Sequence, residues 1–416
     1  MSLRIAMLSI HSSPLGRMGT RDTGGMSVYL QELAREMGSR GHFVDIFTRA
    51  TAKETEPVVK PFPNVRVVSL HVRGAEKAPK TALYDHAEAF AAAMTDFCRE
   101  TAIEYDLIHS NYWLSGVVGS RFAMLHPCPH FITFHTLGAA KMTSRSGHTE
   151  DSRRVDVEAE LAARCDGVIA PTAAERLRLI SLCGARSETI HVVPCGVNLK
   201  RFAPDAGDDA PAEELRKDPG RAVLLGVGRF DPMKGIQRLL AGVARLNAAG
   251  AAVDLVLVGG DGPGSPEHRR VRRQVRGLGM DERVRIVGSV DHRKMPSYYR
   301  GADAVGVASR YESFGLVVLE ALACGTPVVS TPVGVAPEVI RPGVNGYLAA
   351  AGDAESLAQT IARTLRLARE RDPLQIHATV SEFDWSRVAS LLLDAYRKSI
   401  DPTHRHKMGK HREPAI

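Results

Sequence analysis

Two glutamates, Glu312 and Glu320, stand eight positions apart in the segment YESFGLVVLEALACG. Glu320 lies in an otherwise apolar run, where a carboxylate must find a partner. Carboxylates accept hydrogen bonds from hydroxyls, so the two suit a ligand rich in sugar hydroxyls. The residues Phe314, Gly315 and Leu316 open a predicted helix whose free N–H groups favour an anion. An exposed helix residue is the alternative for Glu320, and the apolar setting contradicts it.

Two cations, Arg229 and Lys234, flank a Pro-containing turn in GVGRFDPMKG, directly after a predicted strand. An arginine fork and a mobile lysine ammonium together suit a diphosphate. A solvated basic turn explains the segment equally well in isolation. Asp231 stands where GxGxxG would need its third glycine, so no dinucleotide fingerprint is present.

The first half of the chain offers weaker signals. Gly24 and Gly25 end a long polar loop and precede a predicted helix, where backbone N–H groups can approach an anion. A plain loop-to-helix turn is the simpler interpretation of this segment alone. His135 ends the predicted strand HFITFHT beside Thr136, at an expected switch point of the sheet. A lone histidine at a strand end is more often structural than catalytic.

The elements that must position these residues are short β-branched runs alternating with amphipathic helices, a pattern typical of parallel sheets covered on both faces. The polar stretch between residues 203 and 219 interrupts the pattern, which then restarts. We therefore expect an α/β fold with two doubly wound Rossmann-like domains facing a central cleft. The expected parts are a domain over 1–203, a domain over 219–384, a helix over 385–400 and a disordered basic tail over 401–416.

Composition excludes several classes of protein. The chain has 416 residues, 44% hydrophobic content and a net charge of 54 − 47 = +7, which are ordinary for a globular protein. The six cysteines form no CxxC, and no run is long enough to span a membrane. We expect a cytoplasmic protein with small-molecule substrates, without nucleic acid as a partner and without an integral membrane segment. A homodimer is compatible with the sequence.

Taken together, these segments resemble the retaining glycosyltransferases of family 4, which have the two-domain GT-B fold. The resemblance comes from ESFGLVVLEALACGTPVV, GRFDPMKG and GGMSVYLQELAREMGSRGH, and it extends over nearly the whole chain except the tail. Within that family the chain resembles first the D-inositol 3-phosphate glycosyltransferases, which make the first glycoside of mycothiol, and next the sucrose-phosphate synthases. HSSPLGRMGTRDTGGMSVY, HSNYWLSG, FHTLGAAK and SRRVDVE support this similarity.

The resemblance implies a nucleoside diphosphate sugar as donor, UDP-GlcNAc or another UDP-hexose. Arg229 and Lys234 would neutralise the diphosphate, Glu320 would hold the ribose and Glu312 the donor sugar. The residues implied in catalysis are His135, Arg229, Lys234 and Glu312. The residues implied in donor binding are Gly25, Arg229, Lys234, Val290, Glu312, Phe314, Gly315, Leu316 and Glu320.

The acceptor implied by the resemblance is a phosphorylated polyol such as inositol 3-phosphate. The residues implied in binding its polyol are His11, Asp22, Thr23, Gly24, Met26 and Ser27, and those implied for its phosphate are Lys80, Tyr112, Thr136 and Arg154. The inositol-using enzymes have Asn where this chain has Ser27, which leaves the polyol's identity open. No cofactor and no catalytic metal are expected.

Four other functions remain as alternatives. Two are close: a sucrose-phosphate-synthase-like transfer to a hexose phosphate, and a nucleotide-sugar epimerase. A nicotinamide dehydrogenase would need the absent GxGxxG. A catalytically silent binding protein would not need the intact set of Arg229, Lys234, Glu312 and Glu320. No carboxylate is evident as a nucleophile, so the resemblance implies a same-face substitution assisted by the leaving phosphate.

Overall fold

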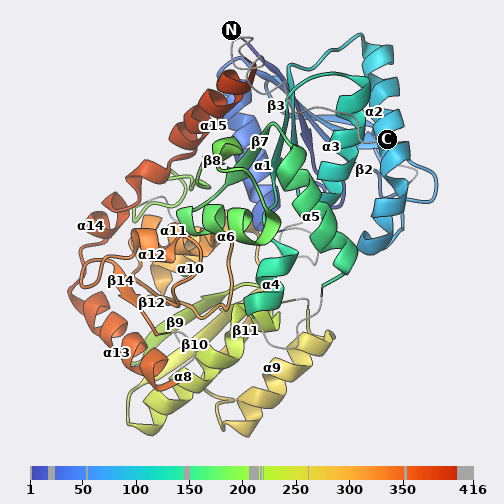
Figure 1. Ribbon diagram of the computed structural model, residues 1–416. Coiled ribbons are helices and arrows are strands. Elements are labelled where there is room, and N and C mark those ends of the chain that lie inside the picture. The colour runs from blue at the N-terminus through green and yellow to red at the C-terminus, as the bar shows by residue number, and fades with distance from the viewer. Residues whose placement is uncertain are drawn as a thin grey trace. The chain divides into compact units, whose positions relative to one another are not determined.

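Parallel strands form two separate sheets, one in each of two compact units (Figure 1). The computed structural model describes residues 2–16, 24–52, 55–144, 150–205, 215, 218, 220–260, 262–350 and 354–400. The first unit contains the described residues of 1–16, 25–194 and 385–416, and the second contains those of 17–24 and 195–384. Asp22, Thr23 and the tail over 401–416, for which predictions were made, lie outside the described residues.

The first unit has an eight-stranded sheet in the order β3-β4-β2-β1-β5-β6-β7-β8. Its inner strands are buried along most of their length, as expected for strands covered on both faces. Helix α1 packs against α15, and α3 packs against α2 and α5. The strands are β1 (Arg4–Leu8), β2 (Phe43–Arg49), β3 (Val58–Phe62), β4 (Val65–Leu70), β5 (Leu107–Asn111), β6 (His130–Thr133), β7 (Gly167–Ala170) and β8 (Ile190–Val192). The helices are α1 (Gly25–Ser39), α2 (Ala87–Thr101), α3 (Trp113–Leu125), α4 (Gly138–Ser144), α5 (Ser152–Arg164), α6 (Ala173–Cys183) and α15 (Trp385–Ile400).

The second unit has a six-stranded sheet in the order β11-β10-β9-β12-β13-β14, with every pair parallel. Its strands are β9 (Ala222–Val227), β10 (Val253–Val258), β11 (Val284–Gly288), β12 (Ala304–Val307), β13 (Val328–Ser330) and β14 (Gly346–Leu348). Its helices are α8 (Ile236–Ala248), α9 (Pro266–Gly277), α10 (Met295–Gly301), α11 (Leu316–Ala323), α12 (Ala336–Val339), α13 (Ala354–Glu370) and α14 (Pro373–Ala378). The prediction of two parallel α/β domains is confirmed.

Two strands were not predicted. Strand β3 pairs antiparallel with β4 at the sheet edge, and it contains Pro61, which only an edge strand tolerates. Strand β14 has three residues and pairs with β13. Both are too short or too polar to stand out from their surroundings in the sequence.

The strand orders place a switch point in each sheet. In the first unit the chain proceeds outward from β1 on one side and from β5 on the other. In the second unit the same holds for β9 and β12. Ligands of open α/β sheets bind beyond the carboxyl ends of such strand pairs. His135 follows β6, one strand away from this point, so its prediction at a switch point was wrong by one strand.

The division of the chain differs from the predicted one at two places. Residues 195–203, predicted in the first domain, belong to the second unit, where the Val197 N–H donates to the Phe383 carbonyl at 2.8 Å. Helix α15, predicted as a separate element, belongs to the first unit. Its Tyr396 hydroxyl lies 2.5 Å from His109 Nδ1 on β5. Backbone pairing and buried polar contacts, which the sequence pattern does not reveal, decide both assignments.

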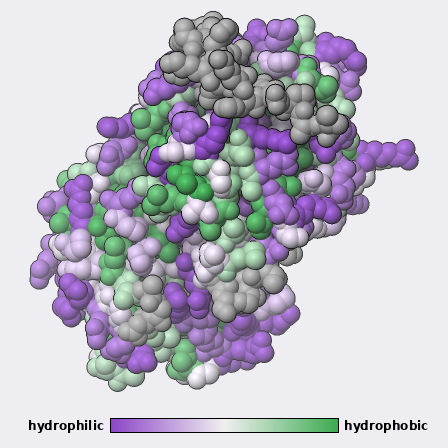
Figure 2. Space-filling model, viewed as in Figure 1, coloured by the Kyte–Doolittle hydropathy of each residue, from purple (hydrophilic) through white to green (hydrophobic). Residues whose placement is uncertain are grey.

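The part of the chain that the structure describes contains no helix with the length and apolar character of a membrane span. On the face seen in Figure 2, hydrophobic residues are interspersed with hydrophilic ones.

Buried histidines should make the first unit sensitive to acid. Burial lowers the pKa of His109 to about 3 and that of His130 to about 4. In an unfolded chain both would titrate near 6.5, so their stabilising contribution is complete above pH 6.5 and is lost as pH falls toward the folded values. We expect the free energy of unfolding to fall by about 1.4 kcal/mol per pH unit for each histidine.

Urea unfolding at pH 7.5 and 5.5, followed by circular dichroism, measures this slope. His130→Gln should reduce the slope, whereas the matched change His71→Gln at an exposed site should leave it unchanged. Equal stability of the unmodified chain at both pH values would contradict the expectation.

Candidate active site

The backbone next to Lys234 lies close against the end of β12. Gly235 has φ +67°, and a Cβ there would lie 1.9 Å from the Ala308 carbonyl oxygen, so only glycine fits. This contact joins the loop after β9 to the end of β12, the two strands of the switch point. The glycine at position 235 therefore determines where the adjacent Lys234 lies.

Lys234 and Glu312 form an ion pair at this switch point. Lys234 Nζ donates to both Glu312 oxygens, at 2.7 Å and 2.8 Å, and the Ser309 hydroxyl donates to Oε1 at 2.7 Å. The Lys234 and Glu312 side chains are 29% and 15% exposed, so an incoming ligand can reach the pair. Arg229, in the same loop, is exposed. The structure thus brings Lys234 and Glu312 together and leaves Arg229 at the surface.

The start of α11 follows directly after the loop that carries Glu312. Gly315 has φ +94° and immediately precedes Leu316, the first residue of the helix. The Phe314 carbonyl accepts from the Val335 N–H at 2.7 Å, which fixes the turn. Backbone N–H groups in the first turn of a helix have no intrahelical acceptor and favour an anion. Gly315 and Leu316 therefore lie where the prediction placed an anion-binding helix start.

The Glu320 carboxylate, although it stands in an apolar run, has polar partners. His292 Nε2 lies 2.7 Å from Oε1, and the Tyr299 hydroxyl donates to Oε2 at 2.7 Å. Burial alone would raise the pKa of Glu320, but the charge and hydrogen bond of His292 and the hydrogen bond of Tyr299 outweigh it and lower that pKa. The carboxylate is thereby kept ionised within the core.

Sequence reasoning missed both partners. His292 and Tyr299 precede Glu320 by 28 and 21 positions, and only the packing of η4 (His292–Lys294) and α10 against α11 brings them together. Val290, predicted to contact the base, is half-buried in the loop after β11. No spacing in the sequence points to these pairings.

Tyr112 follows β5 in the first unit with an unusual backbone conformation. Its φ of +77° and ψ of 154° fall in a region that is almost exclusive to glycine. Such strain costs on the order of 1–3 kcal/mol and is concentrated at functional sites. The Tyr112 ring lies 4.4 Å from the His11 ring and 4.0 Å from Lys80 Nζ. The conformation therefore directs an aromatic side chain into the group of predicted acceptor residues.

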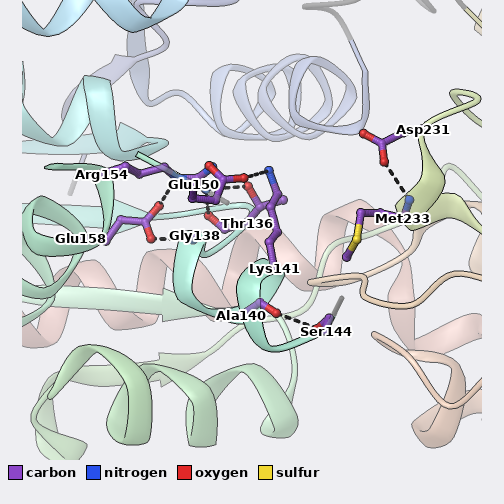
Figure 3. Close-up of polar contacts among 10 residues, drawn as sticks. All are labelled: Thr136, Gly138, Ala140, Lys141, Ser144, Glu150, Arg154, Glu158, Asp231 and Met233. Carbon is purple, nitrogen blue, oxygen red and sulfur yellow. Dashed lines mark hydrogen bonds and ion pairs between the residues drawn. The ribbon is translucent and has the colours of Figure 1, made fainter. Parts of the chain in front are cut away.

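Arg154 is the most heavily bonded residue of this group (Figure 3). Its Nε donates to Glu158 at 2.7 Å, and its Nη1 donates to Glu150 at 2.8 Å. Its Nη2 donates to the Thr136 carbonyl at 2.8 Å and to the Thr136 hydroxyl at 3.1 Å. The guanidinium carbon lies 5.1 Å from the Tyr112 ring. Lys80, Tyr112, Thr136 and Arg154, which are dispersed in the sequence, thus form one cluster in the first unit.

Three charged neighbours of this cluster were not predicted. Glu150 and Glu158 pair with Arg154, and Lys141 Nζ lies 3.3 Å from Glu150. Burial and the charge of Arg154 lower the pKa of Lys141, and Glu150 opposes them. Glu150 and Glu158 stand four positions on either side of Arg154, a spacing that could have indicated ion pairs.

The remaining predicted residues lie near the ends of β1 and β6 and at the start of α1. His11 Nδ1 is buried and has no hydrogen-bond partner among the described residues. Ser27 is buried in α1, 3.3 Å from the Ser12 hydroxyl. His135 has φ +60°, lies 2.9 Å from Asn111, and has a pKa lowered by burial to about 3. Gly25 opens α1, with exposed Gly24 before it and half-buried Met26 after it.

Within the described ranges, no group of three or more His, Cys, Asp or Glu side chains is arranged to hold a metal ion.

Comparison with known proteins gives two family matches. Residues 23–201 match the model "Glycosyltransferase Family 4", and residues 209–378 match "Glycosyl transferases group 1". The D-inositol 3-phosphate glycosyltransferase of Corynebacterium jeikeium is 37% identical over 99% of this chain and 100% of the relative. D-inositol 3-phosphate glycosyltransferase 2 of Catenulispora acidiphila is 38% identical over 96% and 95%.

Solved structures agree. Sucrose-phosphate synthase from Thermosynechococcus elongatus superposes with a TM-score of 0.83 at 31% identity, covering 95% of this chain and 98% of the other. Anabaena HepE, solved with UDP and glucose, gives a TM-score of 0.73 at 22% identity, covering 95% and 100%, and shows the fold alone. With relatives matched over almost its whole length, the chain belongs to the family 4 glycosyltransferases, has the GT-B fold and is a glycosyltransferase.

Proposed function

We propose that this glycosyltransferase moves a hexose from a UDP-sugar, such as UDP-GlcNAc, to a phosphorylated polyol of the inositol 3-phosphate class, with retention at the sugar carbon. The observation that supports the acceptor best is the cluster of Lys80, Tyr112, Thr136 and Arg154 in the first unit. A guanidinium, an ammonium and two hydroxyls match the geometry of a phosphate. The names of the relatives agree with this acceptor.

The donor is assigned to the second unit. The diphosphate would take the Lys234 ammonium from Glu312 and would also meet the N–H groups at the start of α11. Glu312, released from Lys234, could then accept a hydroxyl of the donor sugar. The Glu320 oxygens each use one lone pair on His292 or Tyr299, so each can accept a ribose hydroxyl with another. Arg229, at the surface, would reach the departing phosphate as a second cation.

The acceptor polyol is assigned to the neighbourhood of His11. The buried Nδ1 of His11 has no hydrogen-bond partner among the described residues. A buried polar atom without a partner costs folding free energy unless a ligand satisfies it. The ring packs on Tyr112 of the phosphate cluster, so one acceptor molecule could contact both. Ser27, in place of the Asn of inositol-using enzymes, would reach a hydroxyl through water.

The proposed chemistry is substitution on the same face of the sugar. The bond from the anomeric carbon to the departing phosphate breaks, and a bond to the acceptor oxygen forms on that face. The acceptor proton passes to the departing phosphate oxygen. In this proposal Glu312 accepts the Ser309 hydroxyl and a hydroxyl of the donor sugar, and it does not act as a nucleophile. Cations and helix N–H groups would stabilise the charge that develops on the leaving group, without a catalytic metal.

A hexose phosphate is the second candidate acceptor. It is favoured by the similarity to sucrose-phosphate synthase at 31% identity and by Ser27. The phosphate cluster would serve either acceptor.

A nucleotide-release assay with UDP- and GDP-sugars against inositol phosphates, hexose phosphates and their unphosphorylated forms tests the proposal. We expect UDP release that depends on a phosphorylated acceptor, and a product of retained configuration by NMR. Donor epimerisation without acceptor, or equal turnover with unphosphorylated acceptors, would overturn it.

Lys234→Ala should lower kcat by about 100-fold or more, because it removes a cation from the leaving group and leaves Glu312 unpaired beside it. Steady-state UDP release measures the loss, and the melting temperature reports folding. Lys294→Ala, which removes an exposed cation from the same unit, is the matched control and should retain activity. Unimpaired turnover by Lys234→Ala would remove the donor assignment.

Lys80→Ala should raise the KM of the phosphorylated acceptor about tenfold and leave slow donor hydrolysis unchanged, because Lys80 is exposed and its ammonium lies over the Tyr112 ring of the acceptor cluster. Lys80 is a cleaner target than Arg154, whose removal would leave the buried Glu158 without its cation. Lys77→Ala, at an exposed site nearby, is the matched control. An acceptor KM that does not change would contradict the phosphate cluster.

A further inference from the structure

Glu150 bridges two cations at the acceptor cluster, Arg154 and Lys141. One of its oxygens accepts from Arg154 Nη1 at 2.8 Å, and the other lies 3.3 Å from Lys141 Nζ. The Lys141 and Glu150 side chains are 25% and 15% exposed, whereas Arg154 is 4% exposed. Figure 3 shows Glu150 and Lys141 on the same side of the guanidinium. The Glu150 carboxylate is therefore bound to the same positive groups that would bind a phosphate.

Glu158, the other carboxylate on Arg154, has a different setting. It lies within α5, its side chain is 1% exposed, and its second oxygen accepts from the Gly138 N–H at 2.7 Å. Glu150 precedes the helix, whose N-cap is Asp151. Glu158 is thus fixed within the helix, whereas Glu150 lies before the helix and contacts both Arg154 and Lys141. A substitution at Glu150 therefore leaves the residues of α5 itself unchanged.

The hydrogen bonds of Arg154 decide at which nitrogen a ligand can approach the guanidinium. Nε is committed to Glu158, and Nη2 to the Thr136 carbonyl and hydroxyl. Nη1 donates to Glu150, so a phosphate approaching Arg154 must share or displace that bond. The charges of Arg154 and Lys141 cancel those of Glu150 and Glu158. An isolated phosphate therefore meets a group of side chains with no net charge apart from Lys80.

We propose that Glu150 acts as an internal counter-anion that weakens phosphate binding, and that Lys141 is a further residue that contacts the acceptor phosphate. The proposal rests on the proposed function and assigns these two roles within it. Free phosphate would bind weakly against this competitor, whereas an acceptor that also contacts His11 and its neighbours would displace the carboxylate. Glu150 thereby makes recognition depend on the whole acceptor rather than on its phosphate alone.

Titration of the full chain with orthophosphate, followed by ³¹P NMR, tests the proposal without turnover. Glu150→Gln should bind orthophosphate about tenfold more tightly than the unmodified chain, because it removes a negative charge and keeps the side-chain shape. Glu150→Ala should change affinity in the same direction. Lys141→Gln should weaken binding about tenfold, alone and together with Glu150→Gln.

Glu160→Gln is the matched control, because Glu160 lies on α5, is 55% exposed and pairs with Arg164. Its phosphate affinity should equal that of the unmodified chain. Unchanged or weaker phosphate binding by folded Glu150→Gln, in a chain that transfers sugar to a phosphorylated acceptor, would overturn this inference alone. Absence of both phosphate binding and such transfer would instead overturn the proposed function.

Discussion

A cation that is to meet a phosphate must stay charged and in place while the phosphate is absent. Both units of this glycosyltransferase meet that constraint by pairing the cation with a carboxylate at the carboxyl edge of a parallel sheet. Lys234 pairs with Glu312, and Arg154 pairs with Glu150 and Glu158. A partly buried lysine without such a partner would tend to lose its proton, and a buried arginine would remain as an uncompensated charge. The strands and loops of each unit hold these ion pairs in position.

Backbone geometry provides that support. Gly235 lets one loop approach Ala308 so closely that no side chain would fit, and Tyr112 adopts a conformation that few residues tolerate. Both positions follow strands that flank a switch point. The stability of the surrounding sheets compensates for such local strain, which explains why the strained residues stand at the ends of well-buried strands.

The sequence alone predicts much of this arrangement. Buried strands and their alternation with helices follow from the apolar runs, and the apolar setting of Glu320 predicts that its carboxylate has partners. The ion pair between Lys234 and Glu312 was not predicted, because it joins segments far apart in the sequence. Contacts between distant segments do not follow. His292 of η4 and Tyr299 of α10 reach Glu320 only in the folded structure. Residues 195–203 join the second unit through contacts that include the hydrogen bond from the Val197 N–H to the Phe383 carbonyl and the packing of Phe202 against Tyr299. The pairing of Arg154 with Glu158, four positions further along α5, follows from the i to i+4 spacing of a helix.

Helix α15 has a consequence for how the protein is made. It completes the first unit, where Tyr396 reaches His109 on a central strand, yet it is translated after the whole second unit. On the ribosome, residues 195–384 have emerged before the first sheet receives its last covering helix. The amino-terminal half must therefore wait, with the His109 Nδ1 still without its Tyr396 partner, until residues 385–400 have emerged.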